Sequence, residues 1–293
     1  MCCEQNVKCN LVAEIGCSHL GQMDRAIELI KLAYLSGADY AKFQKRNPIE
    51  CVPFELQNCP HPNRDFAYGN TYLEHRQNLE LDIKQHIDLK QYCNSIGIEY
   101  STSVWDLTSA REIIGISPKY IKIPSACNNH EKLLDVLFFE FDGDVHISLG
   151  MTDKDEKVKL FDRIFNVYKC PERVVIYHCT SEYPCPFERL YLKEVEKLKI
   201  ELLNTGIRTG FSNHGYGISA DIAAYVLGAT WIERHFIDDR TVKHTDAAAS
   251  LEPDGLRKLS RDLKNIQKSL EYKKTSSYNE NEQRVKLKFR ENK

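Results

Sequence analysis

The sequence predicts an α/β protein with the (β/α)8, or TIM barrel, fold. Short apolar segments alternate with helical segments along most of the chain, and eight strand-then-helix units follow one another over about 260 residues. That number of units over that length favours a closed barrel over an open doubly wound sheet. The chain has 293 residues, 42% of them hydrophobic, and is long enough to enclose one large core.

The predicted strands are short apolar runs, several of which contain a charged or hydroxyl side chain. They span residues 11–16, 38–44, 99–104, 120–125, 144–150, 174–180, 210–214 and 231–235. The predicted helices carry apolar residues at helical spacing, and glycines follow the first two of them. They span residues 23–35, 81–96, 107–114, 131–139, 154–168, 189–203, 218–228 and 253–270.

Two segments depart from this alternation. Residues 45–80 form a long irregular region rich in Pro, Asn, His and aromatic residues, which is typical of a functional lid or binding loop. Residues 1–272 form the predicted catalytic barrel, and residues 273–293 are a charged tail that we expect to be flexible.

The bulk properties exclude several classes of protein. The formal charge of −2 gives no electrostatic reason to expect binding to nucleic acid or to an anionic membrane. The sequence contains no apolar run of about 18 residues, and its N-terminus lacks the pattern of a secretory signal. The 11 cysteines are odd in number and form no C-x-x-C pair, so we expect reduced thiols in a cytoplasmic protein.

Polar side chains collect at the carboxyl ends of the predicted strands, where barrel enzymes carry their active sites. These residues are Glu14, Lys42, Gln44, Thr102, Lys122, Ser125, Ser148, Tyr183, Ser212, His214, Glu233 and His235, with Asp246 beyond the last strand. His214 and His235 end neighbouring predicted strands, where two imidazoles could hold a metal ion. The alternative is that each is a hydrogen-bonded histidine at the edge of the sheet.

Charged residues inside apolar strands indicate chemistry rather than packing. An unpaired buried polar group costs about 1 to 3 kcal/mol, and a buried ion costs more. Lys42 and Lys122 with the neighbouring hydroxyls form a plausible phosphate site. The structural alternative for Lys42 is an ion pair with Glu14 or Glu233 inside the barrel. From the residues alone, the chain is a barrel enzyme acting on a phosphorylated substrate with the help of a metal.

Seven segments, in order along the chain, resemble the sialic acid synthase family. They are AEIGCSH at 13–19, AKFQ at 41–44, IKIPS at 121–125, HCTSEYP at 178–184, GFSNH at 210–214, IERHF at 232–236 and ASLEP at 249–253. The resemblance extends from about residue 11 to residue 270. It implies a transferase that condenses phosphoenolpyruvate with N-acetylmannosamine or a related acetamido sugar, giving a nonulosonic acid and phosphate.

The resemblance also implies roles for individual residues. His214 and His235 would bind a divalent metal, usually Mn²⁺, with Mg²⁺ or Co²⁺ as alternatives. Glu14 would transfer a proton near the sugar aldehyde, and Tyr183 and Asp246 would contact the sugar. The residues expected to hold phosphoenolpyruvate are Lys42, Thr102, Lys122, Ser125, Ser148 and Ser212. By the same resemblance we expect a homodimer.

Most departures from the family pattern fall on the sugar side. Cys127 stands where an acidic residue is usual, Asn213 replaces an aspartate, His244 a glycine and Ala247 a histidine. Many members also carry a small C-terminal antifreeze-like domain that contributes an arginine to the partner subunit's site. We expect this chain to comprise the barrel without that domain.

Two other functions are compatible with the sequence. The first is another condensing synthase that uses phosphoenolpyruvate and a sugar phosphate, with Arg46, Arg64 and Arg76 as its second basic cluster. We favour the interpretation that these arginines are solvated loop charges. The second is a catalytically impaired barrel that acts as a binding module. Cys127 supports that view, whereas the retained lysines and histidines argue against it.

Overall fold

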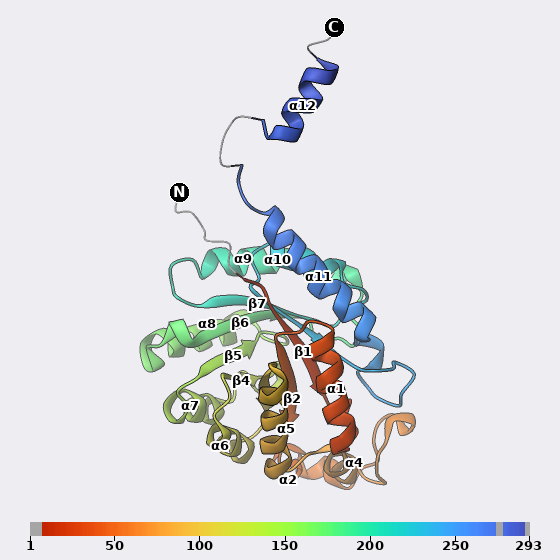
Figure 1. Ribbon diagram of the computed structural model, residues 1–293. Coiled ribbons are helices and arrows are strands. Elements are labelled where there is room, and N and C mark those ends of the chain that lie inside the picture. Colours follow the sequence, from red (N-terminus) through yellow and green to blue (C-terminus); the bar gives the residue numbers. More distant parts are fainter. Residues whose placement is uncertain (1–7, 274–277, 291–293) are drawn as a thin grey trace.

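The computed structural model describes residues 8–273 and 278–290 and confirms the eight-stranded barrel (Figure 1). The strands are all parallel and follow one another in chain order, and β1 pairs with β8 to close the barrel. Their bounds are β1 Asn10–Gly16, β2 Tyr40–Lys45, β3 Glu99–Val104, β4 Tyr120–Ile123, β5 Asp144–Ser148, β6 Val174–Cys179, β7 Arg208–Asn213 and β8 Trp231–His235.

The strand register brings the polar side chains to one level. Glu14 on β1 lies opposite Lys42 on β2 and opposite His235 on β8. Ser103 on β3 lies opposite Lys122 on β4. Because successive side chains alternate between the barrel interior and the helix layer, every second residue of a strand shares one environment.

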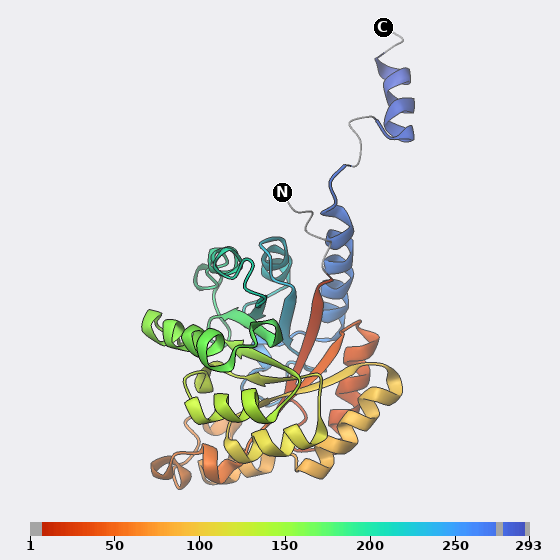
Figure 2. The same ribbon diagram turned by 90° about the vertical axis from the view of Figure 1, so that its left-hand side faces the viewer.

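A layer of helices surrounds the barrel (Figure 2). The main helices are α1 Met23–Leu35, α5 Ile83–Ile96, α6 Leu107–Ile116, α7 Glu131–Glu140, α8 Lys154–Asp162, α9 Lys193–Glu201, α10 Ser219–Val226 and α11 Pro253–Ser269. The predicted bounds of α1 are confirmed. The predicted helix over 154–168 is divided, because α8 continues into the π-helical turn η3, Arg163–Tyr168. The predicted helix over 189–203 is shorter, with only a 3-10 turn, η5 Phe187–Arg189, before α9.

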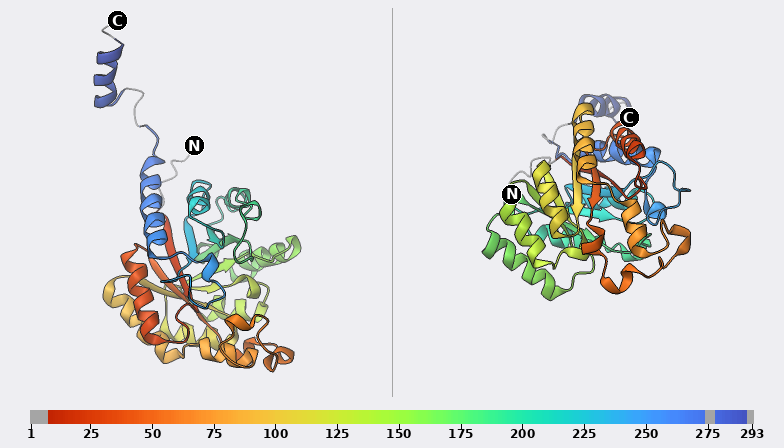
Figure 3. Two further views of the ribbon diagram at one scale, coloured as in Figure 1. Left: turned by 90° about the vertical axis from the view of Figure 1, so that its right-hand side faces the viewer. Right: turned by 90° about the horizontal axis from the view of Figure 1, so that it is seen from below.

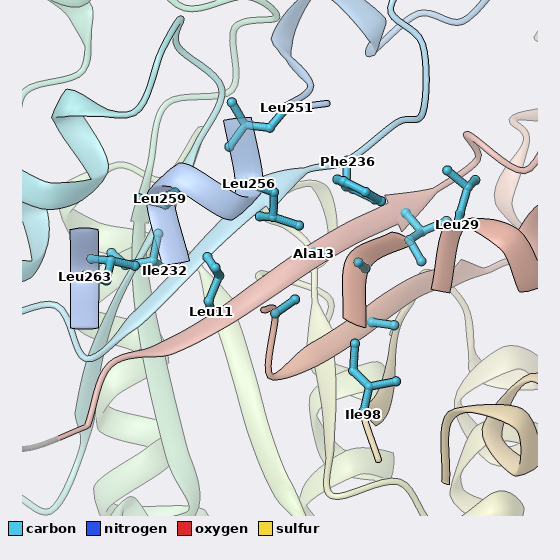
Figure 4. Packing of buried hydrophobic residues seen from close by; sticks show 14 of the residues in the cluster. Leu11, Ala13, Leu29, Ile98, Ile232, Phe236, Leu251, Leu256, Leu259 and Leu263 are labelled. Carbon is cyan, nitrogen blue, oxygen red and sulfur yellow. The ribbon is translucent and has the colours of Figure 1, made fainter. Parts of the chain in front are cut away.

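The helix layer is fastened to the barrel by apolar contacts, of which α11 gives the clearest example (Figure 4). Its buried residues Leu256, Leu259 and Leu263 repeat at helical spacing and belong to the same core cluster as Leu11 and Ile232 of the barrel. Each fully buried leucine contributes about 1.5 to 3 kcal/mol. This packing fixes α11 across the seam where β1 meets β8.

The segment 45–80 is only partly irregular, which corrects the sequence-based expectation. It contains α2 Pro48–Cys51, α3 Phe54–Gln57, the 3-10 turn η1 Arg64–Phe66 and α4 Tyr72–Leu79. α4 begins with a capping box, in which the Thr71 side chain accepts from the Glu74 amide and the Glu74 carboxylate accepts from the Thr71 amide. These helices lie at the lower end of the barrel in Figure 1, which Figure 3 also shows from below.

The predicted C-terminal tail contains a further helix, α12 Glu280–Phe289, which lies away from the barrel in Figure 1. Residues 274–277 and 291–293 of that tail lie outside the described residues, as do residues 1–7, where the secretory pattern was sought. Among the helices of the described chain, none has the length and apolar character needed to span a membrane. The nine cysteines within the described residues are free thiols.

Candidate active site

A cavity of about 350 Å³ opens at the carboxyl ends of the strands, and every strand contributes to its lining. The sequence-predicted site residues that line it are Glu14, Lys42, Lys122, Ser125, Ser148, Tyr183, Ser212, His214, His235 and Asp246. The parallel topology gathers these residues from positions that are far apart in sequence, as expected for a barrel.

The floor of the cavity is a buried group of two lysines and two glutamates. Lys42 forms an ion pair with Glu14, and its Nζ lies 3.8 Å from Oε2 of Glu233. The Nζ of Lys122 lies 2.5 Å from Oε1 of the same Glu233. The alternative considered for Lys42, an ion pair inside the barrel, is therefore confirmed. Lys42 nevertheless also lines the cavity. Two ammonium groups face two carboxylates, so the group is neutral in formal charge.

Burial and pairing act in opposite directions on the charges of this group. Burial alone would raise the pKa of Glu233, but Lys122 and Lys42 overcome that effect and lower it to about 2. Burial lowers the pKa of Lys122, and the attraction of Glu233 opposes the shift. Glu233 is thus held ionised between two lysines. It was noted at the strand end in the sequence but not included among the expected catalytic residues.

The expectation for Thr102 is corrected by the structure. Thr102 is buried but does not line the cavity, whereas its neighbour Ser103 does. Lys42 Nζ donates to Ser103 Oγ over 2.8 Å. Thr102 shares its face of β3 with Tyr100, which packs in the helix layer against Phe43. Ser103 therefore takes the position that the sequence analysis gave to Thr102.

His214 and His235 meet at the rim of the cavity, with ring centroids 5.4 Å apart. The Nδ1 of His214 lies 2.7 Å from the carbonyl oxygen of Thr180, which can only accept a hydrogen bond. Nδ1 therefore carries the proton, and Nε2 keeps its lone pair. Burial lowers the pKa of His214 to about 3, and the neighbouring His235 adds to the shift. The imidazole is consequently neutral at physiological pH.

These two histidines fit the requirements of a divalent metal. Neutral imidazole nitrogens are ligands for first-row divalent ions. Asp246 Oδ2 lies 3.9 Å from His235 Nδ1, close enough to orient that ring. Within residues 8–273 and 278–290, no group of three or more His, Cys, Asp or Glu side chains is arranged to hold a metal. An ion here would take its remaining ligands from water or substrate, as in catalytic sites with open positions.

A cluster of hydroxyl groups lies beside Lys122. Ser125 Oγ accepts from the Gly150 amide over 3.0 Å, and Ser212 Oγ donates to Glu233 Oε1 over 3.1 Å. A Cβ at Gly150 would lie within 2.6 Å of both the Ser181 Oγ and the Ser125 Oγ, so a larger residue here would displace both hydroxyls. Ser181, which follows the end of β6, also lines the cavity, although the resemblance implied no role for it.

Arg234 lies between two site residues on β8 but faces the helix layer. Its guanidinium donates to Asp221 Oδ2 at 2.7 Å and to the carbonyl oxygens of Gly215 at 2.7 Å and Ala249 at 3.3 Å. Asn213 donates to the other oxygen of Asp221 at 2.8 Å, so it too faces away from the cavity. Arg234 therefore joins the loops that follow β7 and β8 and fixes the two strand-end histidines.

The preferred interpretation of the loop arginines is wrong for two of the three. Arg46 and Arg76 are largely buried and line the cavity, whereas Arg64 is exposed and lies outside it. Both buried arginines contact Glu80 Oε1, at 3.4 Å and 3.0 Å respectively. The guanidinium of Arg46 also lies 3.9 Å from the centre of the Trp105 ring. This part of the cavity is therefore more basic than expected.

Two departures from the family pattern lie in this part of the molecule. Cys127 is buried in the core, where its thiol contacts the Trp105 carbonyl oxygen at 3.6 Å, and it does not line the cavity. His244 does line the cavity, and its Nδ1 accepts from the Asp246 amide over 3.2 Å. Neither side chain supplies a negative charge to the site.

Comparison with known proteins identifies related synthases. The NeuB family model matches residues 29–275. The N,N'-diacetyllegionaminic acid synthase of Campylobacter jejuni is 31% identical over 260 residues, covering 89% of this chain and 77% of that protein. The N-acetylneuraminate-9-phosphate synthase of Homo sapiens is 31% identical over 264 residues, covering 89% of this chain and 71% of that protein.

Solved structures agree with this assignment. The N-acetylneuraminic acid synthetase of Leptospira borgpetersenii superposes with a TM-score of 0.80 at 25% identity, covering 98% of this chain and 94% of that one. A truncated 3-deoxy-D-arabino-heptulosonate 7-phosphate synthase of Thermotoga maritima gives a TM-score of 0.65 at 14% identity, covering 90% and 88% of the two chains. The second likeness concerns the fold alone.

Proposed function

Because the chain belongs to the NeuB family, we propose that it condenses phosphoenolpyruvate with N-acetylmannosamine or a related acetamido sugar. The products are a nonulosonic acid and phosphate. One observation carries the proposal. Lys42 and Lys122 converge on Glu233 in the same cavity that holds His214 and His235. A phosphate-binding pole and a candidate metal pair thus face one another in a single cavity.

Phosphoenolpyruvate is assigned to the lysine pole, the part of the cavity around Lys42 and Lys122. Ammonium groups and hydroxyls donate to phosphate and carboxylate oxygens. Lys42 is fixed by Ser103 and Glu14, and Lys122 by Glu233, so neither side chain needs to reorganise when the substrate arrives. Ser125, Ser148 and Ser212 supply further hydroxyls to the same part of the cavity.

The histidine pair is the place for the aldehyde of the sugar. We propose that His214 and His235 hold a divalent ion, Mn²⁺ in the first instance and Mg²⁺ or Co²⁺ as alternatives. Such an ion, when bound, polarises a carbonyl oxygen as a Lewis acid. The Thr180 carbonyl orients His214, and Asp246 lies beside His235. The ring centroid of Tyr183 lies 4.0 Å from that of His214.

The bond changes follow from these positions. C3 of phosphoenolpyruvate attacks the aldehyde carbon, which leaves an alkoxide on the sugar and positive charge at C2. Water adds at C2 and releases a proton. Glu14, held by Lys42 and by Gln44 Nε2 at 2.7 Å, takes up that proton and passes it to the alkoxide. The tetrahedral product then loses phosphate together with its hydroxyl proton to leave the keto acid. Tyr183 and Asp246, which also line the cavity, are the proposed contacts of the sugar.

A panel of acetamido hexoses tests the proposal. Phosphate release and loss of phosphoenolpyruvate are followed with each sugar, with Mn²⁺ added and after chelation. We expect phosphate release only when both an acetamido sugar and the metal are present. Failure with every sugar of the panel would refute the proposal and favour the impaired barrel that acts as a binding module.

A further inference from the structure

We propose that Arg46 and Arg76 form a second anion-binding subsite, which receives a phosphate monoester carried by the acceptor sugar. The inference rests on the proposed function and names its acceptor class as a phosphorylated acetamido hexose. Both arginines line the same cavity as the two lysines. Arg46 directly follows β2, whereas Arg76 lies on α4, so two separate elements bring the guanidinium groups together.

The local charge of this subsite is positive. The side chains of Arg46 and Arg76 are only 10% and 14% exposed, and both pair with the single carboxylate of Glu80. Two guanidinium groups on one carboxylate leave one positive charge in excess. A buried charge without a counterion is costly, and a bound anion removes that cost.

The geometry of the donors is suited to phosphate. The Nε of Arg76 is buried and has no hydrogen-bond partner within the part of the chain that the structure describes. Its Nη2 contacts the Cys17 sulfur at 3.5 Å, which is a weak acceptor. Arg46 lies flat on Trp105 and is thereby held in one orientation. A guanidinium fork with free donors binds phosphate oxygens in pairs.

A purely structural role explains these contacts less well. Glu80 already anchors to the barrel by accepting from the Arg46 amide over 3.1 Å. The ion pair of Arg76 with Glu80, four positions further along the same segment, is local and does not fasten α4 to the barrel. A bound anion that accepts hydrogen bonds from both guanidinium groups would explain why Arg76 is buried beside Arg46.

The cavity consequently has two basic poles: Glu14 and Glu233 balance the charge of the lysine pole, whereas the arginine pole has only the carboxylate of Glu80. Gln44 lies between them, since it accepts from Arg46 Nη2 and donates to Glu14 Oε1 over 2.7 Å. Glu14 in turn pairs with Lys42 of the first pole. Phosphoenolpyruvate at the lysines and a sugar phosphate reaching the arginines place the two anionic groups at opposite ends, with the reacting carbons between them.

The test compares N-acetylmannosamine with its 6-phosphate as acceptors, by the loss of phosphoenolpyruvate. The unchanged protein should prefer the phosphorylated sugar by about tenfold or more in kcat/KM, the effect of hydrogen bonds to a charged group. Arg76→Met should abolish that preference, and Arg76→Lys should reduce it. Arg64→Met is the matched control, an exposed arginine of the same segment, and should keep the preference. Thermal unfolding of each variant confirms that it folds.

Each outcome decides the matter. Equal use of the two sugars by the unchanged protein, or an undiminished preference in Arg76→Met, overturns the subsite while the proposed function stands. If neither sugar leads to consumption of phosphoenolpyruvate, the failure concerns the proposed function, which the full panel of acetamido sugars then decides. In that event, calorimetric titration with the 6-phosphate decides the subsite. Binding that is lost in Arg76→Met but kept in Arg64→Met supports it, and absent or unaltered binding overturns it.

Discussion

Lys122 and Glu233 form a buried ion pair across the interior of the barrel, with 2.5 Å between Nζ and Oε1. They come from β4 and β8, which are four strands apart in the closed sheet. Glu233 also faces Lys42, so one carboxylate contacts both lysines of the proposed phosphoenolpyruvate site. Removing it should affect the stability of the barrel as well as the charge of the site.

Glu233→Gln should lower the free energy of unfolding by about 3 kcal/mol, because a buried ammonium loses its partner. The double variant Glu233→Gln/Lys122→Met should recover part of that loss, since it also removes the unpaired charge. Chemical denaturation of the unchanged protein, both single variants and the double variant gives the coupling energy. Losses that simply add would show that the two residues are not coupled.

His214→Ala and His235→Ala should each weaken Mn²⁺ binding by more than about a hundredfold. Loss of a ligand should exceed the 10- to 100-fold effect of removing an outer hydrogen-bond partner. Turnover should fall in parallel while the barrel remains folded. Calorimetric titration with Mn²⁺ measures the effect.

His178→Gln is the matched control for the metal variants. His178 is also a strand histidine, but its Nε2 contacts the Leu190 carbonyl oxygen at 2.8 Å and it does not line the cavity. This variant should bind Mn²⁺ as the unchanged protein does. Full activity of His214→Ala after exhaustive chelation would disprove the metal assignment.

Ser103→Ala should raise the KM for phosphoenolpyruvate by about tenfold, because Lys42 loses a hydrogen-bond partner next to the substrate. Thr102→Val should leave that KM almost unchanged, since Thr102 lies outside the cavity lining. Steady-state kinetics on the two variants compares neighbouring residues of one strand. The reverse order of effects would favour the assignment made from the sequence.

The stability of the protein should fall in mild acid through its buried histidines. His86 is fully buried, and its Nδ1 lies 2.8 Å from the Tyr100 hydroxyl. Burial lowers the pKa of His86 from 6.5 to about 3, and the charge of Lys45 adds to the shift. Between these two pH values the unfolded chain binds a proton that the folded chain does not. The free energy of unfolding therefore falls as the pH falls from 6.5 to about 3.

One such histidine adds up to about 1.4 kcal/mol per pH unit to the slope of the free energy of unfolding against pH. His86→Gln should therefore show a shallower pH dependence of unfolding than the unchanged protein over this window. His130→Gln, at an exposed position, should keep the original slope. Urea denaturation at a series of pH values measures all three proteins, and an identical slope in His86→Gln would contradict the assignment.

The barrel could be predicted because its elements carry local signals. The apolar face of α1 and its end before Gly37 gave the helix its correct bounds, and the apolar run of β8 did the same for that strand. The order of the strands then required only the rule that consecutive parallel units lie side by side. His214 and His235 could be placed together for the same reason.

The helices of segment 45–80 could not be predicted from apolar periodicity. α4 has no apolar face that is distinct from its polar one, because only His75 and Leu79 are buried. The signal that was present is the capping box of Thr71 and Glu74. A search for caps, in addition to apolar spacing, would have found this helix.

The buried arginines and the register of β3 depend on contacts that local sequence does not encode. Arg46 forms an ion pair with Glu80, which lies 34 positions further along the chain. The residues next to either one contain no pattern that predicts this pair. β3 carries three adjacent hydroxyl residues, Ser101, Thr102 and Ser103. Only the register of β3 with β2 shows which of them face the barrel interior. Ser103 lies opposite Gln44, which lines the cavity, and Thr102 lies opposite Phe43, which is in the helix layer.

The contacts of Arg234 have a consequence for how this site can evolve. They tie the loop after His214 to the loop that carries Asp246, so this half of the rim behaves as one rigid block. The segment 45–80 contributes Arg46, Arg76 and Leu79 to the lining of the same cavity. We therefore expect substitutions in this segment to alter the choice of acceptor while the block keeps its shape. New sugar specificities can arise here without rebuilding the chemistry.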